Sequence, residues 1–358
     1  MSGTFLSGWL ALLVAGGTIL YKAMNNRVEK EIAFVCSFLL LVLLELFCFV
    51  ILRSYVAWAL LSLAWVIFYI CIPGSALLPV DNKAVLITGT DSGIGHELAK
   101  YLDRLGFIVF AGVLNKKGPG AEELKRSCSQ RLSILQMDIT NSAHVKEAYL
   151  KVTEEVKNAG LWGVVNNAGI MGLIADGELL PMSAYTQCMD VNFFGTVRVS
   201  KTFLPLLRKS KGRLVNISSM AGNGGIPKQY APNRLIFFPG ILGTPELWDE
   251  QERNLLENLT PDVKRDYGED YILALKTILS HMPAFCGSDL SPVLCDVRHA
   301  LLAKSPCGLY TPGKNSYKYL CLFSYFPLRF YDFFIRRLQN IEIVPRALRE
   351  PEMKCKNA

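Results

Sequence analysis

The sequence predicts an α/β protein in which a doubly wound parallel sheet follows an N-terminal helical membrane anchor. Two observations support this prediction. Three long apolar runs dominate the first 80 residues, and from residue 82 onward short apolar runs end in glycine or polar residues. We therefore expect an anchor in residues 1–80, a sheet domain in 81–245 and a C-terminal segment in 246–358.

The expected anchor consists of the apolar runs at 5–21, 32–52 and 55–72. About 20 apolar residues at a helical rise of ~1.5 Å cross the hydrocarbon core of a bilayer. A cleavable signal peptide would need basic residues before a short apolar core, and the N-terminus MSGTF has none. These runs predict one to three membrane spans.

The charges indicate a membrane protein whose sheet domain faces the cytosol. Lys22, Arg27 and Lys30 lie between the first two apolar runs, and basic loops remain on the cytosolic side. With three spans, the domain after Val80 would also be cytosolic. The net charge of +7 is spread along the chain without a basic block, so no nucleic-acid partner is predicted.

The ten cysteines are scattered and show no CxxC spacing. This pattern predicts reduced thiols and no metal site.

A glycine loop follows the first expected strand, KAVLITG at 83–89. Gly89, Gly93 and Gly95 come between this strand and an amphipathic helix. Without Cβ atoms at these positions, backbone N–H groups can approach a pyrophosphate at the helix N-terminus. The loop therefore predicts a Rossmann-like dinucleotide site.

The second expected strand, 107–114, ends where the adenosine ribose of a dinucleotide would lie. An acid there binds the 2′-hydroxyl of NAD, and an arginine binds the 2′-phosphate of NADP. The chain has Val113, Leu114 and Asn115 at this point, followed by two lysines that we interpret as a solvated turn. In the absence of an arginine, NAD is favoured.

Several motifs together resemble the short-chain dehydrogenase/reductase family. They are TG-x3-G-x-G at 88–95, Asp138 at a strand end, NNAG at 166–169, Asn192 in MDVNFFGT and NISS at 216–219. The resemblance implies that the cofactor is bound by Thr88, Gly89, Gly93, Ile94, Gly95, Asp138, Asn166, Ala168 and Gly169.

The same resemblance implies individual roles for four residues. Asp138 would contact adenine, and Asn166 would stabilise the sheet beside the cofactor. Asn192 would hold a water molecule in a proton relay, and Ser219 would hydrogen-bond the substrate oxygen.

Longer stretches, among them VFAGVLNKKGPGAEELKRSCS and KTFLPLLRKSKGRLVNISSM, resemble the membrane-anchored hydroxysteroid dehydrogenases of this family. This implies a protein of the endoplasmic reticulum membrane that oxidises a 17β-hydroxysteroid, such as estradiol or testosterone, to the ketosteroid with NAD. A retinol dehydrogenase is the alternative substrate class. Relatives of this kind form homodimers, partly through the helix that follows the catalytic tyrosine.

The catalytic pair of the family, Tyr-x-x-x-Lys, is missing from its usual place. The nearest candidates are Tyr230, eleven residues after Ser219, and Arg234 in the position of the lysine. A guanidinium is a planar fork and does not replace a compact ammonium conservatively, and Pro232 fits only the first turn of a helix.

The crossover helix that follows the tyrosine in the family is also missing. Pro239-Gly240 follows Tyr230 by nine positions, whereas a parallel crossover needs about a dozen residues or more. We therefore expect the NAD-binding domain to be truncated after residue 222, with a less stable fold and a weakened dimer. The alternatives are a catalytically impaired nucleotide-binding isoform and the product of a skipped or mispredicted exon.

The C-terminal segment begins with a charged, helix-compatible stretch at 248–271, which resembles the lid over the steroid pocket in the family. Residues 317–337 are rich in Phe and Tyr beside a basic pair. This composition suits either an interfacial helix or the mouth of an apolar pocket.

Overall fold

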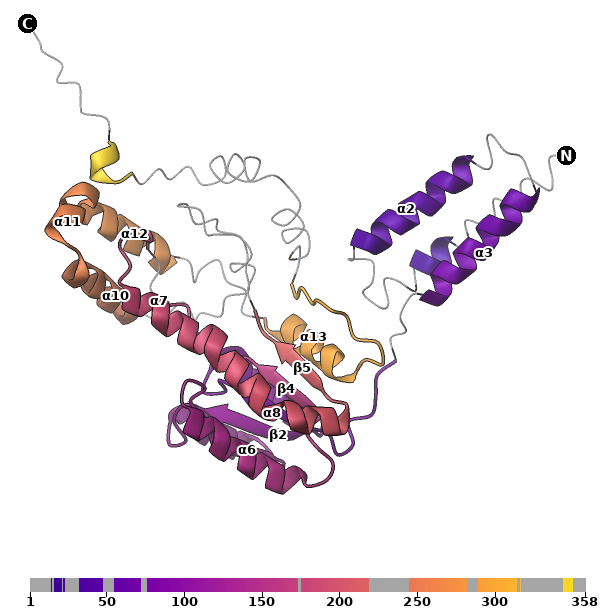
Figure 1. Ribbon diagram of the computed structural model, residues 1–358, viewed down its shortest axis with the longest axis horizontal. Coiled ribbons are helices and arrows are strands. Elements are labelled where there is room, and N and C mark those ends of the chain that lie inside the picture. Colours follow the sequence, from indigo (N-terminus) through magenta and orange to yellow (C-terminus); the bar gives the residue numbers. More distant parts are fainter. Residues whose placement is uncertain are drawn as a thin grey trace, which may run out of the picture. The chain divides into compact units, whose positions relative to one another are not determined.

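The computed structural model (Figure 1) describes residues 14, 16–20, 22, 32–47, 55–71, 76–172, 175–218, 245–281, 289–313, 316 and 344–349. The chain divides into two compact units, which are described separately. The first comprises Met1–Pro79 with Leu302–Gly308, and the second comprises Val80–Leu301 with Leu309–Ala358.

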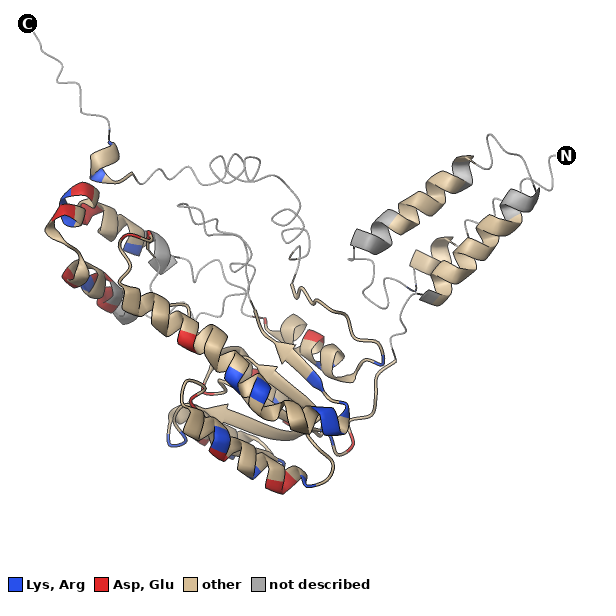
Figure 2. Cartoon of the chain, viewed as in Figure 1, with Lys and Arg blue, Asp and Glu red and all other residues tan. Residues whose placement is uncertain are grey.

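The first unit contains two apolar helices, α2 (Ile32–Phe47) and α3 (Tyr55–Cys71). Trp65 is buried between them, with edge-to-face contacts to Phe38 at 5.4 Å and Phe68 at 6.4 Å. Figure 2 shows no charged residue on α3, whereas both signs of charge cover α6 and the helices α10 to α12 of the other unit. Many apolar side chains are exposed, including Leu39, Leu40, Leu43, Leu44, Leu60, Leu63 and Ile70.

The helices α2 and α3 have 16 and 17 residues, and no helix within the described residues is both long and apolar enough to cross a bilayer. Much of the first apolar run, at 5–21, lies outside the described residues. The number of spans stays a prediction.

The second unit is built on a five-stranded parallel sheet. Its strands are β1 (Ala84–Thr88), β2 (Ile108–Val113), β3 (Leu132–Gln136), β4 (Gly163–Asn166) and β5 (Arg213–Asn216), in the order β3-β2-β1-β4-β5. This order reverses at β1, which is the signature of a doubly wound sheet. The predicted fold of this unit is confirmed.

Helices cover both faces of the sheet because right-handed crossovers leave on opposite sides of the reversal point. On one face, α6 (Ser142–Val156) and α8 (Thr196–Ser210) contribute Val152 and Phe203 to a core that includes Phe110 of β2. On the other, α4 (Gly93–Arg104) packs on β1 and β2, and α5 (Pro119–Ser127) packs on β3. In a sheet of this order, ligands bind at the carboxyl ends of the strands beside the reversal point.

The sheet is least buried at β5. All residues of β1 and β4 are buried, whereas alternate residues of β5 are exposed and Leu214 has 42% of its surface accessible. The start of β5 is nevertheless fixed, because the Arg213 guanidinium donates to the carbonyl of Ala300 at 2.7 Å in α13 (Ser291–Leu302). Burial lowers the pKa of Arg213.

Three helices, α10 (Pro245–Asn258), α11 (Pro261–Tyr267) and α12 (Glu269–His281), form a separate small layer. Its core includes Leu255, Leu259 and Ile272, and it packs on Leu179 in the loop that follows β4. Lys276 of α12 forms ion pairs with Asp249 at 2.6 Å and Glu252 at 2.5 Å in α10.

The remaining described elements are α7 (Met182–Met189), a π-helical segment η3 (Asp190–Gly195) that joins it to α8, and the short 3-10 helix η6 (Arg346–Leu348). Residues 317–337, predicted as an interfacial helix or the mouth of an apolar pocket, lie outside the described residues.

Candidate functional site: a dinucleotide cradle at the strand ends

The glycine loop between β1 and α4 forms a tight cradle. Gly89 and Gly93 have φ angles of +67° and +64°, which favour glycine. A Cβ at Gly89 would lie 2.7 Å from the Cα of Ala168, and a Cβ at Gly95 would overlap the carbonyl oxygen of Gly89 and the amide of Asn167. The loop therefore leaves no space for a side chain at Gly89 or Gly95.

The N-terminus of α4 is open to an anion. Its N-cap residue, Ser92, makes no side-chain capping hydrogen bond. The first N–H groups of a helix have no partner within the helix and carry the positive end of its dipole. Together with Gly93, Ile94 and Gly95 in the first turn, these groups suit a pyrophosphate.

The NNAG motif locks the end of β4 to the end of β1. The hydroxyl of Thr88 accepts from the backbone N–H groups of Asn167 and Ala168, both at 3.0 Å. The Asn167 side chain donates to the carbonyls of Thr88 and Gly89, both at 2.9 Å. Asn167 was not among the residues predicted for the site, although its position in the motif could have indicated it.

Asn166 joins three elements at the centre of the sheet. Its side-chain nitrogen donates to Ser200 Oγ in α8 at 3.0 Å and to Asn216 Oδ1 in β5 at 2.8 Å. The residue is only 4% exposed, and its Oδ1 has no hydrogen-bond partner among the described atoms. Asn166 therefore holds β4 to β5 and α8 at the centre of the sheet, and its role beside the cofactor stays a prediction.

Asn192 holds the loop that follows NNAG. Its Oδ1 accepts from Ile170 N–H at 2.8 Å, and its Nδ2 donates to the Ile170 carbonyl at 2.7 Å. The residue lies in the π-helical segment η3, a conformation that is frequent at functional sites. This geometry gives Asn192 a positioning role, and its part in a proton relay stays a prediction.

Asp138 follows β3 at the same edge of the sheet. One of its carboxylate oxygens, Oδ1, accepts from the backbone N–H of Thr140 at 2.9 Å and from the Thr140 hydroxyl at 2.7 Å. The preceding residue, Met137, still pairs with Val113 of β2 at 2.8 Å. Asp138 is therefore held beside the end of β2, where adenine is expected.

Asp91 is a site residue that the sequence analysis missed. Its Oδ1 accepts from the backbone N–H groups of Leu114 at 3.0 Å and Asn115 at 3.3 Å, and its Oδ2 lies 3.0 Å from Leu114 N. The carboxylate therefore lies at the end of β2, where the strand itself supplies no acid.

An ion-pair network ties α4 to α5 next to the cradle. Glu123 of α5 lies 2.9 Å from Lys100 Nζ and 3.4 Å from His96 Nε2. The hydrogen bond from Lys100 lowers the pKa of Glu123. The same bond with Glu123 raises the pKa of Lys100.

Ser219, Tyr230 and Arg234 lie outside the described residues, although β5 ends at Asn216, three residues before the serine. The structure therefore brings together the predicted cofactor-binding residues and Asn192, and it leaves the predicted acid–base residues untested.

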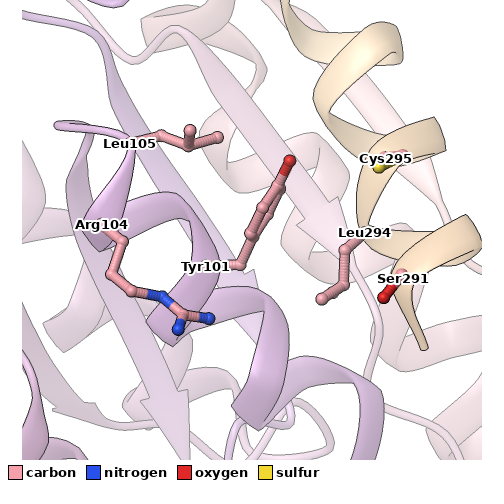
Figure 3. Close-up of a pocket in the computed structure, with 6 residues that line it drawn as sticks. All are labelled: Tyr101, Arg104, Leu105, Ser291, Leu294 and Cys295. Atoms are coloured by element: carbon pink, nitrogen blue, oxygen red, sulfur yellow. The ribbon is translucent and has the colours of Figure 1, made fainter. Parts of the chain in front are cut away.

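A cavity lies at the far end of α4. It has a volume of about 400 Å³ and is formed between α4 and α13 (Figure 3). Its lining consists of Tyr101, Arg104, Leu105, Ser291, Leu294 and Cys295. Burial raises the pKa of Tyr101. Because Tyr101 follows Gly93 by about two helical turns, this cavity is separate from the cradle.

Comparison with known proteins agrees with this geometry. The short chain dehydrogenase family model matches residues 83–231. The 17-beta-hydroxysteroid dehydrogenase type 2 of Homo sapiens is 45% identical, with 99% of each chain covered. This chain belongs to the short-chain dehydrogenase family.

Other members of the family show the same relation. Estradiol 17-beta-dehydrogenase 2 of Mus musculus is 44% identical, with 96% of this chain and 97% of the relative covered. The 11-beta-hydroxysteroid dehydrogenase type 2 of Oryctolagus cuniculus is 38% identical over 76% and 74% of the two chains. As a short-chain dehydrogenase, the chain is an oxidoreductase by family.

Proposed function

We propose that this short-chain dehydrogenase binds NAD and a hydroxysteroid at a membrane and oxidises the hydroxyl group to a ketone, at a rate well below that of its relatives. The observation that carries the proposal is the complete cradle, formed by Gly89, Gly93, Gly95 and the lock between Thr88 and NNAG. It occurs in a chain that is 45% identical to a 17-beta-hydroxysteroid dehydrogenase over nearly its whole length.

The residues of the cradle fit a nicotinamide dinucleotide. The first turn of α4 would bind the pyrophosphate, Asp138 would contact adenine, and Asn166 would stabilise the sheet beside the nicotinamide. When bound, the cofactor accepts a hydride from the substrate. The protein's own contribution is to orient the two molecules and to remove the proton of the hydroxyl group.

That proton transfer is where this chain departs from its family. A positioned general base contributes about 10²–10⁴-fold to rate. Tyr230 and Arg234 are the nearest candidates for the family's tyrosine and lysine, and both the spacing from Ser219 and the arginine differ. The alignment with the human relative spans 383 positions, more than the 358 residues of this chain, so the relative has residues without a counterpart here.

Two observations support a steroid substrate: the names of the relatives, and the layer of α10 to α12, called the lid-like layer below. In this proposal α10 to α12 form one wall of the substrate site, since they pack on the loop after β4 through Leu179. Lipophilic substrates partition into membranes, and the exposed apolar surfaces of α2 and α3 suit contact with lipid. We place the protein at the endoplasmic reticulum membrane, with its sheet unit facing the cytosol.

The experiment uses the purified full chain in mixed micelles. NAD binding is measured by calorimetry, and estradiol oxidation is measured with NAD and with NADP. We expect NAD to bind and estradiol to be oxidised slowly, with NAD preferred and with loss of turnover in Tyr230→Phe. Absence of NAD binding, or equal use of NADP, would overturn the proposal. Retinol run in parallel distinguishes the alternative substrate class.

Membrane topology is tested separately. Protease added to sealed microsomes should digest the sheet unit if it faces the cytosol. Full protection of this unit would reverse the assigned orientation, without bearing on the chemistry.

A second candidate function is nucleotide binding without turnover. It is favoured by the missing Tyr-x-x-x-Lys spacing and by the short connection from Tyr230 to Pro239-Gly240. The same short connection leads us to expect a weakened homodimer. NAD binding with estradiol oxidation no faster than in Tyr230→Phe would support this second function.

A further inference from the structure

The choice between NAD and NADP depends on the group that meets the adenosine ribose at the end of β2. Val113, Leu114 and Asn115 offer no charged side chain there. The structure places the carboxylate of Asp91 at this point instead, from the glycine loop 23 residues earlier. We infer that Asp91 is the residue that selects NAD over NADP, an inference that rests on the proposed function.

The carboxylate of Asp91 is held firmly in this position. Leu114 N–H lies 3.0 Å from both of its oxygens, and Asn115 N–H donates to Oδ1 at 3.3 Å. The backbone of Asp91 is packed as well, because a Cβ at Gly120 would overlap the Asp91 carbonyl oxygen. The side chain cannot turn away without leaving two backbone N–H groups of the β2 end without their acceptor.

The turn that follows β2 is fixed by further hydrogen bonds. Gln136 Oε1 accepts from Lys116 N at 2.9 Å, and its amide donates to the Leu114 carbonyl. Asn115 Oδ1 accepts from Lys117 N at 3.0 Å. The N–H groups of residues 114–117 are therefore all engaged within the protein.

These contacts disfavour a 2′-phosphate in two ways. Backbone N–H groups at a turn are common donors to phosphate, and here Asp91 already accepts from two of them. A phosphate at the same place would also meet a like charge. A ribose 2′-hydroxyl is a donor, and the carboxylate keeps free lone pairs to accept from it.

The opposing influence comes from Lys116 and Lys117, whose side chains are exposed next to this turn. Their ammonium groups would attract a 2′-phosphate. Asp91 is closer to the strand end, because its carboxylate accepts from the backbone N–H groups of Leu114 and Asn115 just after β2. The side chains of Lys116 and Lys117 are exposed to solvent.

The test measures affinity and needs no turnover. The Kd of NAD and of NADP is determined by calorimetry on the full chain and on the Asp91→Asn variant, which keeps one acceptor oxygen and removes the charge. We expect the wild type to bind NAD at least tenfold more tightly than NADP. In Asp91→Asn, NADP affinity should rise about 10-fold to 100-fold, while NAD affinity falls a few-fold.

Two further variants complete the design. Asp138→Asn, the matched control, removes a charge at the neighbouring strand end and should change both affinities alike, leaving their ratio within about twofold. Lys116→Gln with Lys117→Gln tests the rival residues and should leave the NAD preference in place. Thermal melting of each variant confirms that the fold is retained.

The outcomes separate the two claims. An unchanged ratio of NAD to NADP affinity in folded Asp91→Asn, with a wild type that prefers NAD, overturns the assignment of Asp91 and leaves the proposed function intact. A wild type that prefers NADP overturns the assignment of Asp91 and the NAD preference of the proposed function together. Failure of the wild type to bind either dinucleotide overturns the proposed function and this inference together.

Discussion

The two halves of the sheet differ in how completely they are buried. β1 and β4 are buried at every residue, whereas β5 alternates and exposes 42% of Leu214. A parallel strand is normally covered by its neighbouring strand and by a crossover helix. Only nine positions separate Tyr230 from Pro239, so the sequence predicts that this helix is missing or shortened. The comparison indicates that the cofactor half, around β1, has its core within the described residues, and we expect the β5 half to depend on the segment that follows residue 222.

Helix α8 and the residues that precede it show a similar contrast. Val199 and Phe203 of α8 are fully buried in the sheet core. The residues before α8 are less buried: Met189 of α7 and Phe193 and Phe194 of η3 are about half exposed. A group of exposed apolar side chains often marks a surface that contacts another molecule or segment.

The first prediction compares the same substitution in the two halves. Leu86 of β1 is fully buried beside Phe110, so Leu86→Ala should destabilise the fold by about 2–5 kcal/mol. Leu214→Ala in β5 removes a side chain that is already 42% exposed and should cost less than about 1.5 kcal/mol. Urea unfolding of both variants measures the difference, and equal losses would mean that β5 is as well packed as β1.

The second prediction concerns the cradle. Gly95→Ala would bring a Cβ into the Gly89 carbonyl and the Asn167 amide, so the loop must shift. We expect a loss of about 1–3 kcal/mol in stability and at least a tenfold loss in NAD affinity.

Gly308→Ala is the control, because a Cβ at Gly308 meets nothing within 4 Å. Thermal unfolding and calorimetry with NAD compare the two variants. Wild-type NAD affinity in Gly95→Ala would show that the cradle is looser than described.

The third prediction concerns pH and the lid-like layer. Burial, with the hydrogen bond to Glu178 at 3.1 Å, raises the pKa of Tyr267 to about 12. The folded state therefore favours the neutral phenol. Below about pH 10, Tyr267 is neutral in both the folded and the unfolded state, and its contribution to stability is complete. Between about pH 10 and 12 only the unfolded tyrosine loses its proton, so this contribution is lost as the pH rises.

Tyr267→Phe should lose less stability than the wild type between pH 10 and pH 12. Urea unfolding across this range measures the two slopes. Identical slopes would show that Tyr267 is not held in the layer as described.

Local patterns in the sequence predicted much of the sheet and the cradle. The strand expected at 107–114 is β2 at Ile108–Val113, and the glycines at 89, 93 and 95 predicted the loop and the start of α4. These features depend on neighbouring residues and on glycine's freedom at positive φ, which a sequence shows directly.

Contacts between distant residues could not be predicted in this way. Asp91 meets the end of β2 across 23 residues, and Tyr271 donates to Asp176 across 95. The hydrogen bonds between Asn192 and Ile170 also depend on the π-helical segment, which has no distinctive sequence pattern. Such contacts arise from the tertiary fold, so only the structure shows them.

The most direct test of the central claim measures cofactor binding and turnover on one sample of the full chain. The account predicts saturable NAD binding, together with estradiol oxidation about 10²–10⁴-fold slower than that of the human relative assayed alongside. Failure of the chain to bind NAD would contradict it, since the cradle would then not be enough to bind the cofactor. Turnover equal to that of the relative would also contradict it, because the missing tyrosine–lysine spacing would then not limit the reaction.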